Sequence, residues 1–220
     1  MVALQEQVQV AKALPFNMLE ESLIIFVKNP VLGKVKSRLA ADIGDEKALK
    51  VYEYLLGYTK QVCLECPVDR VIYYSDEIRF DDNFELKYFE KELQFGAHLG
   101  ERMEDAIKKS LKLGYTKVVL IGSDCGEISS DIIDEAFEEL DQNEVVLGPA
   151  FDGGYYLVGV KNSCPNIFQN KIWGQSNVLV DTLLDLKKMN LKYHLLTTLN
   201  DVDTISDLEL LTEKLGKEIL

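Results

Sequence analysis

The stretch Leu23-Ile-Ile-Phe-Val-Lys-Asn-Pro-Val-Leu-Gly-Lys-Val-Lys-Ser-Arg38 joins an apolar run to a basic turn. Residues 23–27 are apolar at consecutive positions, which is typical of a strand that is covered on both faces. The eleven residues that follow contain four cations, Lys28, Lys34, Lys36 and Arg38. We therefore expect a central strand of an α/β sheet whose carboxyl end leads into a cationic turn.

Further strands and helices alternate along the chain. Apolar runs predict strands at residues 70–74, 117–121, 145–147, 155–160 and 193–196, and helical spacing predicts helices at 47–66, 99–113, 131–140, after Trp173 and after Ser206. Ser129 or Ser130 is expected to cap the third of these helices, and Ser206 the last. Such alternation is typical of βαβ units, so we expect a Rossmann-like, three-layer αβα fold with a mostly parallel sheet.

The domain organisation follows from length and composition. The chain has 220 residues, of which 47% are hydrophobic, so it can bury a full core. No linker, repeat or low-complexity tract interrupts it. We therefore predict an N-terminal arm, residues 1–20, and a single domain, residues 21–220. The arm could dock on the domain or on a neighbouring subunit, which leaves a homo-oligomer open.

Charge and hydropathy limit the partners. The chain carries 37 acidic and 24 basic residues, a formal net charge of −13, which disfavours nucleic acid as a partner. Neither a secretory leader nor an apolar run of about 20 residues is present, so we expect a cytoplasmic protein with reduced cysteines and no membrane partner.

The basic turn is the first candidate site. Ligands of open α/β sheets bind outside the carboxyl ends of the strands, and a turn with Gly33 can present backbone N–H groups to phosphate. Lys28, Lys36 and Arg38 would add the charge that a di- or triphosphate requires. The alternative interpretation is a solvated basic loop, and the Gly-Lys-Ser/Thr of a Walker loop is absent.

Aspartates follow two other predicted strands. Asp124 ends Ile121-Gly-Ser-Asp124, and Asp203 lies in Asp201-Val-Asp203, after residues 193–196. Such carboxylates can hold Mg²⁺ or Mn²⁺ against phosphate oxygens, so Asp124 and Asp203 are the candidate metal ligands. Asp124 could instead form an Asx turn, and we interpret Asp207 as a residue of the first turn of a helix.

A glycine pair marks a third candidate region, Gly148-Pro-Ala-Phe-Asp-Gly-Gly-Tyr-Tyr156. Gly153 and Gly154 would allow the backbone to approach a ligand closely, with Asp152 beside them as a candidate general base and Tyr155 on the acceptor side. The alternative is a plain hairpin turn. Trp173 could stack on a base or a sugar, although a single tryptophan is more often a core anchor.

These motifs together resemble those of a glycosyltransferase-A-like family of largely unassigned function. The resemblance covers residues 23–211 and includes the basic turn, Leu99-Gly-Glu-Arg-Met103, the segment before Asp124, the glycine pair, Trp173 and Asp201-Val-Asp-Thr204. Some members are labelled arsenosugar-biosynthesis glycosyltransferases, and the family is distantly similar to molybdopterin and phospholactate guanylyltransferases. One departure is Gly126, where the family usually has proline.

The resemblance implies a nucleotide-diphosphosugar transferase fold, with phosphates near Lys28, Lys36 and Arg38 and a metal at Asp124 and Asp203. The leading hypothesis is transfer of a glycosyl group from a nucleoside-diphosphate sugar to a small acceptor. One alternative is nucleotidyl transfer from a nucleoside triphosphate, although the glycine-rich loop of typical sugar nucleotidylyltransferases is missing. The other alternative is a nucleotide-binding module without catalysis.

Overall fold

The computed structural model describes residues 20–216 and 219–220, so residues 1–19 of the expected N-terminal arm lie outside the described part. In chain order the elements are β1 (Glu21–Val27), α2 (Ser37–Ile43), α3 (Asp45–Glu65), β2 (Asp69–Tyr74), β3 (Glu90–Leu93), α4 (Leu99–Lys112), β4 (Lys117–Ile121), α5 (Ser130–Glu139), β5 (Val145–Pro149), β6 (Tyr155–Lys161), α6 (Val178–Lys188), β7 (Tyr193–Leu195) and α7 (Ile205–Leu215). Within the described residues, no helix combines the length and the apolar character that a membrane span needs.

The strands form one seven-stranded sheet in the order β3-β2-β1-β4-β6-β5-β7. β1 pairs in parallel with both β2 and β4, and β5 pairs in parallel with β7. β6 runs antiparallel to both of its neighbours, β4 and β5. The expectation of a mostly parallel sheet is confirmed, with β1 inside the sheet as its apolar run predicts.

Helices cover both faces of this sheet, so the αβα layering is confirmed. Leu23, Ile25 and Val27 of β1 share a buried cluster with residues of α3 and α5. Ile24 and Phe26 face the other side, in a cluster with residues of α4 and α6. Because side chains of a strand alternate between its two faces, a strand covered on both faces is apolar at consecutive positions, as at residues 23–27.

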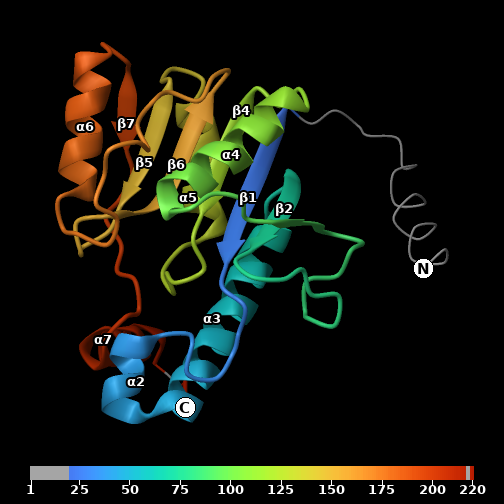
Figure 1. The fold of residues 1–220 in the computed structure, drawn as a ribbon, viewed down its shortest axis with the longest axis vertical. Helices are drawn as coiled ribbons and strands as arrows, with labels where there is room; N and C mark the ends of the chain where they lie inside the picture. Colours follow the sequence, from blue (N-terminus) through green and yellow to red (C-terminus); the bar gives the residue numbers. More distant parts are fainter. Residues whose placement is uncertain (1–19, 217–218) are drawn as a thin grey trace.

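A third, smaller cluster lies beyond the carboxyl end of β1. It joins α2, the first half of α3 and α7 through Leu39, Val51, Leu55, Leu208 and Leu211. Figure 1 shows these helices grouped at the end to which the arrow of β1 points. The cluster anchors the two segments on either side of the candidate site, namely the basic turn before α2 and the aspartate segment before α7.

The structure differs from the sequence-based expectations in three elements. β3 has no apolar run, because it is an edge strand with exposed side chains. The sequence predicts a helix only from residue 47, but the short helix α2 already begins at Ser37. Gly44, at φ 86°, separates α2 from α3. The last helix is capped by Thr204, not by Ser206, because Thr204 and Asp207 form a reciprocal capping box. Ser129 caps α5, one of the two alternatives expected.

Candidate functional site

The basic turn after β1 brings its cations to the edge of one pocket. Gly33 adopts φ 73°, and the amide of Lys34 donates to the carbonyl oxygen of Val31 at 3.0 Å, which closes the turn. The pocket has a volume of about 270 Å³ and is lined by Lys28, Lys34, Lys36, Ser37, Arg38, Tyr52, Asp124 and Asp203. The structure thus brings the expected phosphate-binding residues together with both expected metal ligands.

Lys36 is the centre of this pocket. Its side chain is only 3% exposed, and its Nζ lies 2.5 Å from Oδ1 of Asp124 and 3.3 Å from Oδ1 of Asp203. Burial alone lowers the pKa of Lys36, but the charges of Asp124 and Asp203 outweigh it and hold the pKa above its usual value. Lys36 is therefore a buried cation whose charge depends on two carboxylates from distant parts of the chain.

Backbone pairing places the aspartate segment before α7 beside the end of β4. The amide of Val202 donates to the carbonyl oxygen of Asp124 at 3.0 Å, and Asp201 forms an antiparallel bridge with Cys125. The carboxylate of Asp207 accepts from the amides of Asp203 and Thr204, so its role is structural, as we interpreted. The segment therefore positions Asp203 against Lys36 and Arg38 of the basic turn.

The aspartates fit a divalent cation only in part. Among the described residues, no three His, Cys, Asp or Glu side chains form a metal-binding group. Asp203 gives one oxygen to Lys36 and the other to Arg38. Asp124 contacts Lys36 through Oδ1, and its side chain is 37% exposed. Mg²⁺ is commonly held by one or two carboxylates together with substrate phosphates and waters, so Asp124 suits such an ion once phosphates are present.

Tyr52 of α3 is a pocket residue that the sequence did not reveal. Its hydroxyl accepts from the amide of Lys28 at 2.8 Å and lies 3.1 Å from Oγ of Ser123. It therefore ties the end of β1 to the end of β4, the two strand ends that flank the pocket. Tyr52 lies in the middle of a helix with ordinary apolar spacing, so no local signal distinguishes it from a core residue.

In the loop that carries the glycine pair, backbone conformation and close packing require glycine at position 153. This residue adopts φ 90°, and a Cβ added to it would lie 2.0 Å from the carbonyl oxygen of Ser176. Its own carbonyl accepts from the amide of Leu179 at the start of α6. Asp152 is exposed, and its Oδ1 accepts from the amide of Gly154 at 2.9 Å. Asp152 and the two glycines are not part of the lining of the basic pocket.

Tyr155 and Trp173 are not part of the lining of the basic pocket. Their rings contact each other edge to face, with centroids 6.0 Å apart, and both pack against the buried cluster of α4 and α6. Trp173 lies against Gly100, whose missing side chain leaves room for the indole. Among the described residues, the buried indole N–H of Trp173 has no hydrogen-bond partner. Both residues are partly buried, which for Trp173 agrees with the anchoring alternative that we kept open; the ligand-binding role of each stays a prediction.

Comparison of the sequence with models of known protein families identifies the family of this chain. A family model described as "Uncharacterized protein conserved in bacteria (DUF2064)" matches residues 59–175, more than half of the chain. The chain belongs to this family. No curated protein matches it.

Solved structures resemble this DUF2064 protein over most of its length. A crystal structure from Desulfovibrio desulfuricans G20, described as a candidate nucleotide-diphospho-sugar transferase, is 33% identical, with a TM-score of 0.82 over 90% of this chain and 88% of that chain. A cytidylyltransferase from Leptospira borgpetersenii is 15% identical, with a TM-score of 0.60 over 90% and 87%. A 4-diphosphocytidyl-2C-methyl-D-erythritol synthase from Anaerococcus prevotii is 10% identical, with a TM-score of 0.56 over 90% and 96%. The expected fold is confirmed.

Gly126 stands where the family that this sequence resembles usually has proline, and close packing explains the glycine. A Cβ at this position would lie 2.5 Å from Cδ2 of Leu211 in α7 and 3.2 Å from Cδ2 of Leu55 in α3. The glycine therefore lets α3 and α7 close over the turn that carries Asp124. The backbone pairing of Asp124 and Cys125 with the segment before α7 holds this turn in place.

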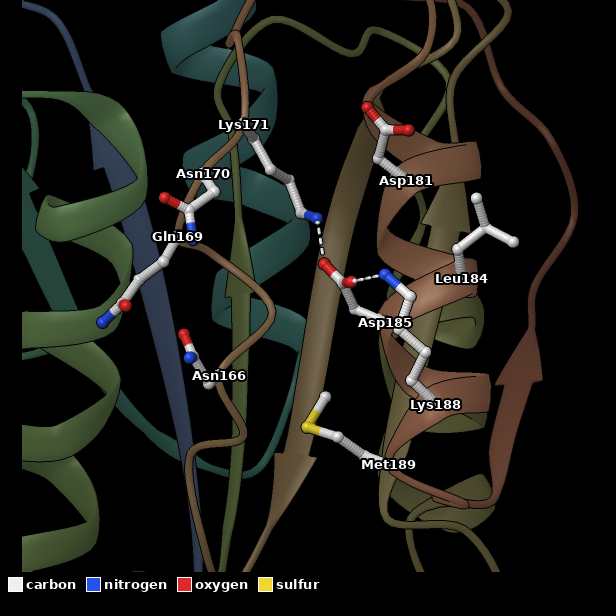
Figure 2. A pocket seen from close by; sticks show the side chains of 9 residues that line it. All are labelled: Asn166, Gln169, Asn170, Lys171, Asp181, Leu184, Asp185, Lys188 and Met189. Atoms are coloured by element: carbon white, nitrogen blue, oxygen red, sulfur yellow. Dashed lines mark hydrogen bonds and ion pairs between the residues drawn. The ribbon is translucent and has the colours of Figure 1, made fainter.

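A larger pocket of about 500 Å³ lies elsewhere in this DUF2064 protein, between residues 166–171 and α6. Figure 2 shows that the ammonium of Lys171 points at Asp185, which also contacts Lys188. The distances from the two ammonium groups to the carboxylate are 2.8 and 3.1 Å. Because these charges satisfy one another, the smaller pocket, with its excess of cations, is the better candidate for an anionic ligand.

Asp201 belongs to the motif Asp201-Val-Asp-Thr204, but the sequence analysis did not select it as a site residue. With Tyr52, it is the second such residue near the pocket. Burial, together with the charges of Asp124, Asp203 and Asp152, raises its pKa to about 7 against the opposing charge of Lys36. Between about pH 4 and pH 7, the folded protein therefore keeps a proton that the unfolded chain releases, so stability falls as the pH rises through this window.

We expect Asp201→Asn to remove this pH dependence. Urea unfolding should show the variant about 1–3 kcal/mol more stable than the wild type near pH 8, where the buried carboxylate of the wild type is ionised. Near pH 4 the two proteins should have similar free energies of unfolding. An equal difference at both pH values would contradict a raised pKa.

Proposed function

We propose that this protein is a transferase that uses a nucleotide-activated donor, and that it moves a glycosyl group from a nucleoside-diphosphate sugar to a small acceptor. The observation that carries the proposal is the convergence of four cations with Asp124 and Asp203 in one pocket. The pocket lies at the carboxyl ends of β1 and β4, where open α/β sheets bind their ligands. The relative that is 33% identical, described as a candidate nucleotide-diphospho-sugar transferase, supports the same class of donor.

The basic residues would bind the diphosphate of the donor. Lys28, Lys34 and Arg38 line the pocket from one turn, and the side chain of Arg38 is 66% exposed, so it can reach a ligand. Glycosyl transfer breaks the bond between the anomeric carbon and the diphosphate, and negative charge develops on the leaving group. Fixed cations around that group favour the transition state over the ground state.

Asp124 would hold Mg²⁺ or Mn²⁺ together with phosphate oxygens. Bound there, the ion would offset charge on the leaving diphosphate. Asp152 would act on the acceptor side, where its exposed carboxylate would take the proton of the attacking hydroxyl. The hydrogen bond from the amide of Gly154 fixes the orientation of this carboxylate.

The test is a ligand screen followed by product analysis. Nucleoside-diphosphate sugars, nucleoside triphosphates and nucleoside diphosphates are each added with and without Mn²⁺, and the apparent melting temperature is measured, because a ligand of the native state raises it. We expect nucleotide sugars with metal to stabilise the protein most, and mass spectrometry to detect release of a nucleoside diphosphate.

The other results of this screen separate the alternatives. Stabilisation by triphosphates with release of pyrophosphate would replace glycosyl transfer by nucleotidyl transfer. Binding without any product, over many acceptors, would favour a nucleotide-binding module. No stabilisation by any nucleotide would contradict the proposed use of the pocket.

A further inference from the structure

Lys36 occupies the place between the two carboxylates where a cation is expected. Its Nζ contacts Oδ1 of Asp124 at 2.5 Å and Oδ1 of Asp203 at 3.3 Å. The aromatic ring of Tyr52 lies 6.0 Å from the same ammonium. With its side chain 3% exposed, Lys36 is held as firmly as a core residue.

The backbone of Lys36 shows that this placement is built into the turn. Lys36 lies at φ 50° and ψ 43°, in the left-handed region, directly before the first residue of α2. Side chains other than glycine enter this region at a cost, which is accepted only where surrounding contacts enforce it. A glycine would remove this cost but would carry no ammonium. The strained position therefore points to the charge of Lys36 as the useful property.

The formal charges of the pocket oppose a bare metal ion. Four cations and two carboxylates line it, which leaves a formal net charge of +2 in a protein whose total is −13. A divalent cation at Asp124 would meet the ammonium of Lys36 at close range, where burial limits screening by water. The negative charge of a diphosphate would offset this net positive charge and attract both the ammonium and the metal ion.

We infer that Lys36 excludes a bare divalent cation from the ligand-free pocket and makes phosphate binding a precondition for metal binding. This inference rests on the proposed function. When a diphosphate binds, Lys36 transfers its ammonium from the carboxylates to phosphate oxygens. Asp124 is then free to hold Mg²⁺ or Mn²⁺ against the same phosphates. The pocket thus accepts the phosphate chain and the metal ion as one unit.

This exchange couples the two ligands. Because binding free energies are linked, phosphate raises the affinity for the metal by the same factor by which the metal raises the affinity for phosphate. A factor of about 10 lies within the range that such couplings usually show. In the ligand-free protein the ammonium prevents the two carboxylates from being left without a cation.

The experiment measures Mn²⁺ binding by the full chain with inorganic pyrophosphate as the phosphate probe. Electron paramagnetic resonance reports free Mn²⁺ for the protein alone, and water-proton relaxation reports protein-bound Mn²⁺ when pyrophosphate is present. We expect pyrophosphate to raise the Mn²⁺ affinity of the wild type about tenfold or more. We expect Lys36→Met to bind Mn²⁺ without pyrophosphate about tenfold more tightly than the wild type.

The matched control is Lys34→Met, which removes one exposed cation from the same pocket. Its Mn²⁺ affinity without pyrophosphate should stay close to that of the wild type, because Lys34 makes no ion pair with either aspartate. An equal gain in both variants would show that net charge alone acts, which overturns the specific role of Lys36. Circular dichroism confirms that each variant is folded.

The wild type decides the inference even if Lys36→Met does not fold. Equal Mn²⁺ affinity with and without pyrophosphate would overturn it, and affinity that depends on pyrophosphate would support it. Failure of the proposed function gives a different result, in which neither pyrophosphate nor any nucleotide binds in the presence or absence of Mn²⁺. In that case, the Mn²⁺ affinities of the wild type and Lys36→Met still test whether Lys36 blocks the metal.

Discussion

Replacement of Asp124 by asparagine is expected to abolish the metal-dependent binding of a nucleotide donor. Asparagine keeps the shape of the side chain but loses the charge, so it can neither balance Lys36 nor hold a divalent cation firmly. Calorimetric titration of a nucleoside-diphosphate sugar in the presence of Mn²⁺ should show affinity reduced at least about a hundredfold, or about 2.7 kcal/mol. Binding without metal should change much less.

The fold should survive this substitution. The ion pair of Asp124 with Lys36 is short, at 2.5 Å, but the aspartate is 37% exposed and Asp203 remains beside the ammonium. We therefore expect a loss of about 1–2 kcal/mol in the free energy of unfolding, measured with urea. Asp42→Asn, an equal charge change at an exposed position of α2, is the control and should alter neither property. Unchanged metal-dependent affinity in Asp124→Asn would refute the metal assignment.

Most of the fold could be predicted because buried strands leave a local signal. Residues 23–27 are apolar at every position because both faces of β1 are covered. β3 leaves no such signal, since its Glu-Lys-Glu-Leu sequence lies at the edge of the sheet with mostly exposed side chains. The cap at Thr204 could not be separated from Ser206 by residue type, because both hydroxyls suit an N-cap.

The candidate site could be predicted only where its residues follow strands closely, lie in the basic turn after β1, or lie in the segment between β7 and α7. Lys28 follows β1, and Asp124 lies three residues after β4, so the parallel order of β1 and β4 brings them to one edge. Trp173 lies in a long connection, and its packing on Gly100 depends on a path that no local pattern encodes. Tyr52 reaches the pocket from the middle of a helix, where its spacing is that of a core residue.

Gly153→Ala is expected to produce the largest loss of stability among the loop substitutions. The added Cβ would lie 2.0 Å from the carbonyl oxygen of Ser176, a backbone atom that cannot turn aside, and φ is 90°. Left-handed strain and overpacking together should cost about 3 kcal/mol, observed as a lower urea midpoint. The clash would also move the loop that carries Asp152 away from the start of α6, because the carbonyl of Gly153 accepts from Leu179.

Gly154→Ala is the matched control, one residue further along the same loop. Its Cβ would lie 3.2 Å from Oδ1 of Asp152, which belongs to a side chain that can rotate, so we expect a cost of about 0.5 kcal/mol. Comparison of the two variants separates the loop's structural role from the proposed chemistry of Asp152. If Gly153→Ala loses both stability and transfer while Gly154→Ala keeps stability and loses transfer, the orientation of the Asp152 carboxylate matters by itself. Equal stabilities of the two variants would contradict the close packing of Gly153 on Ser176.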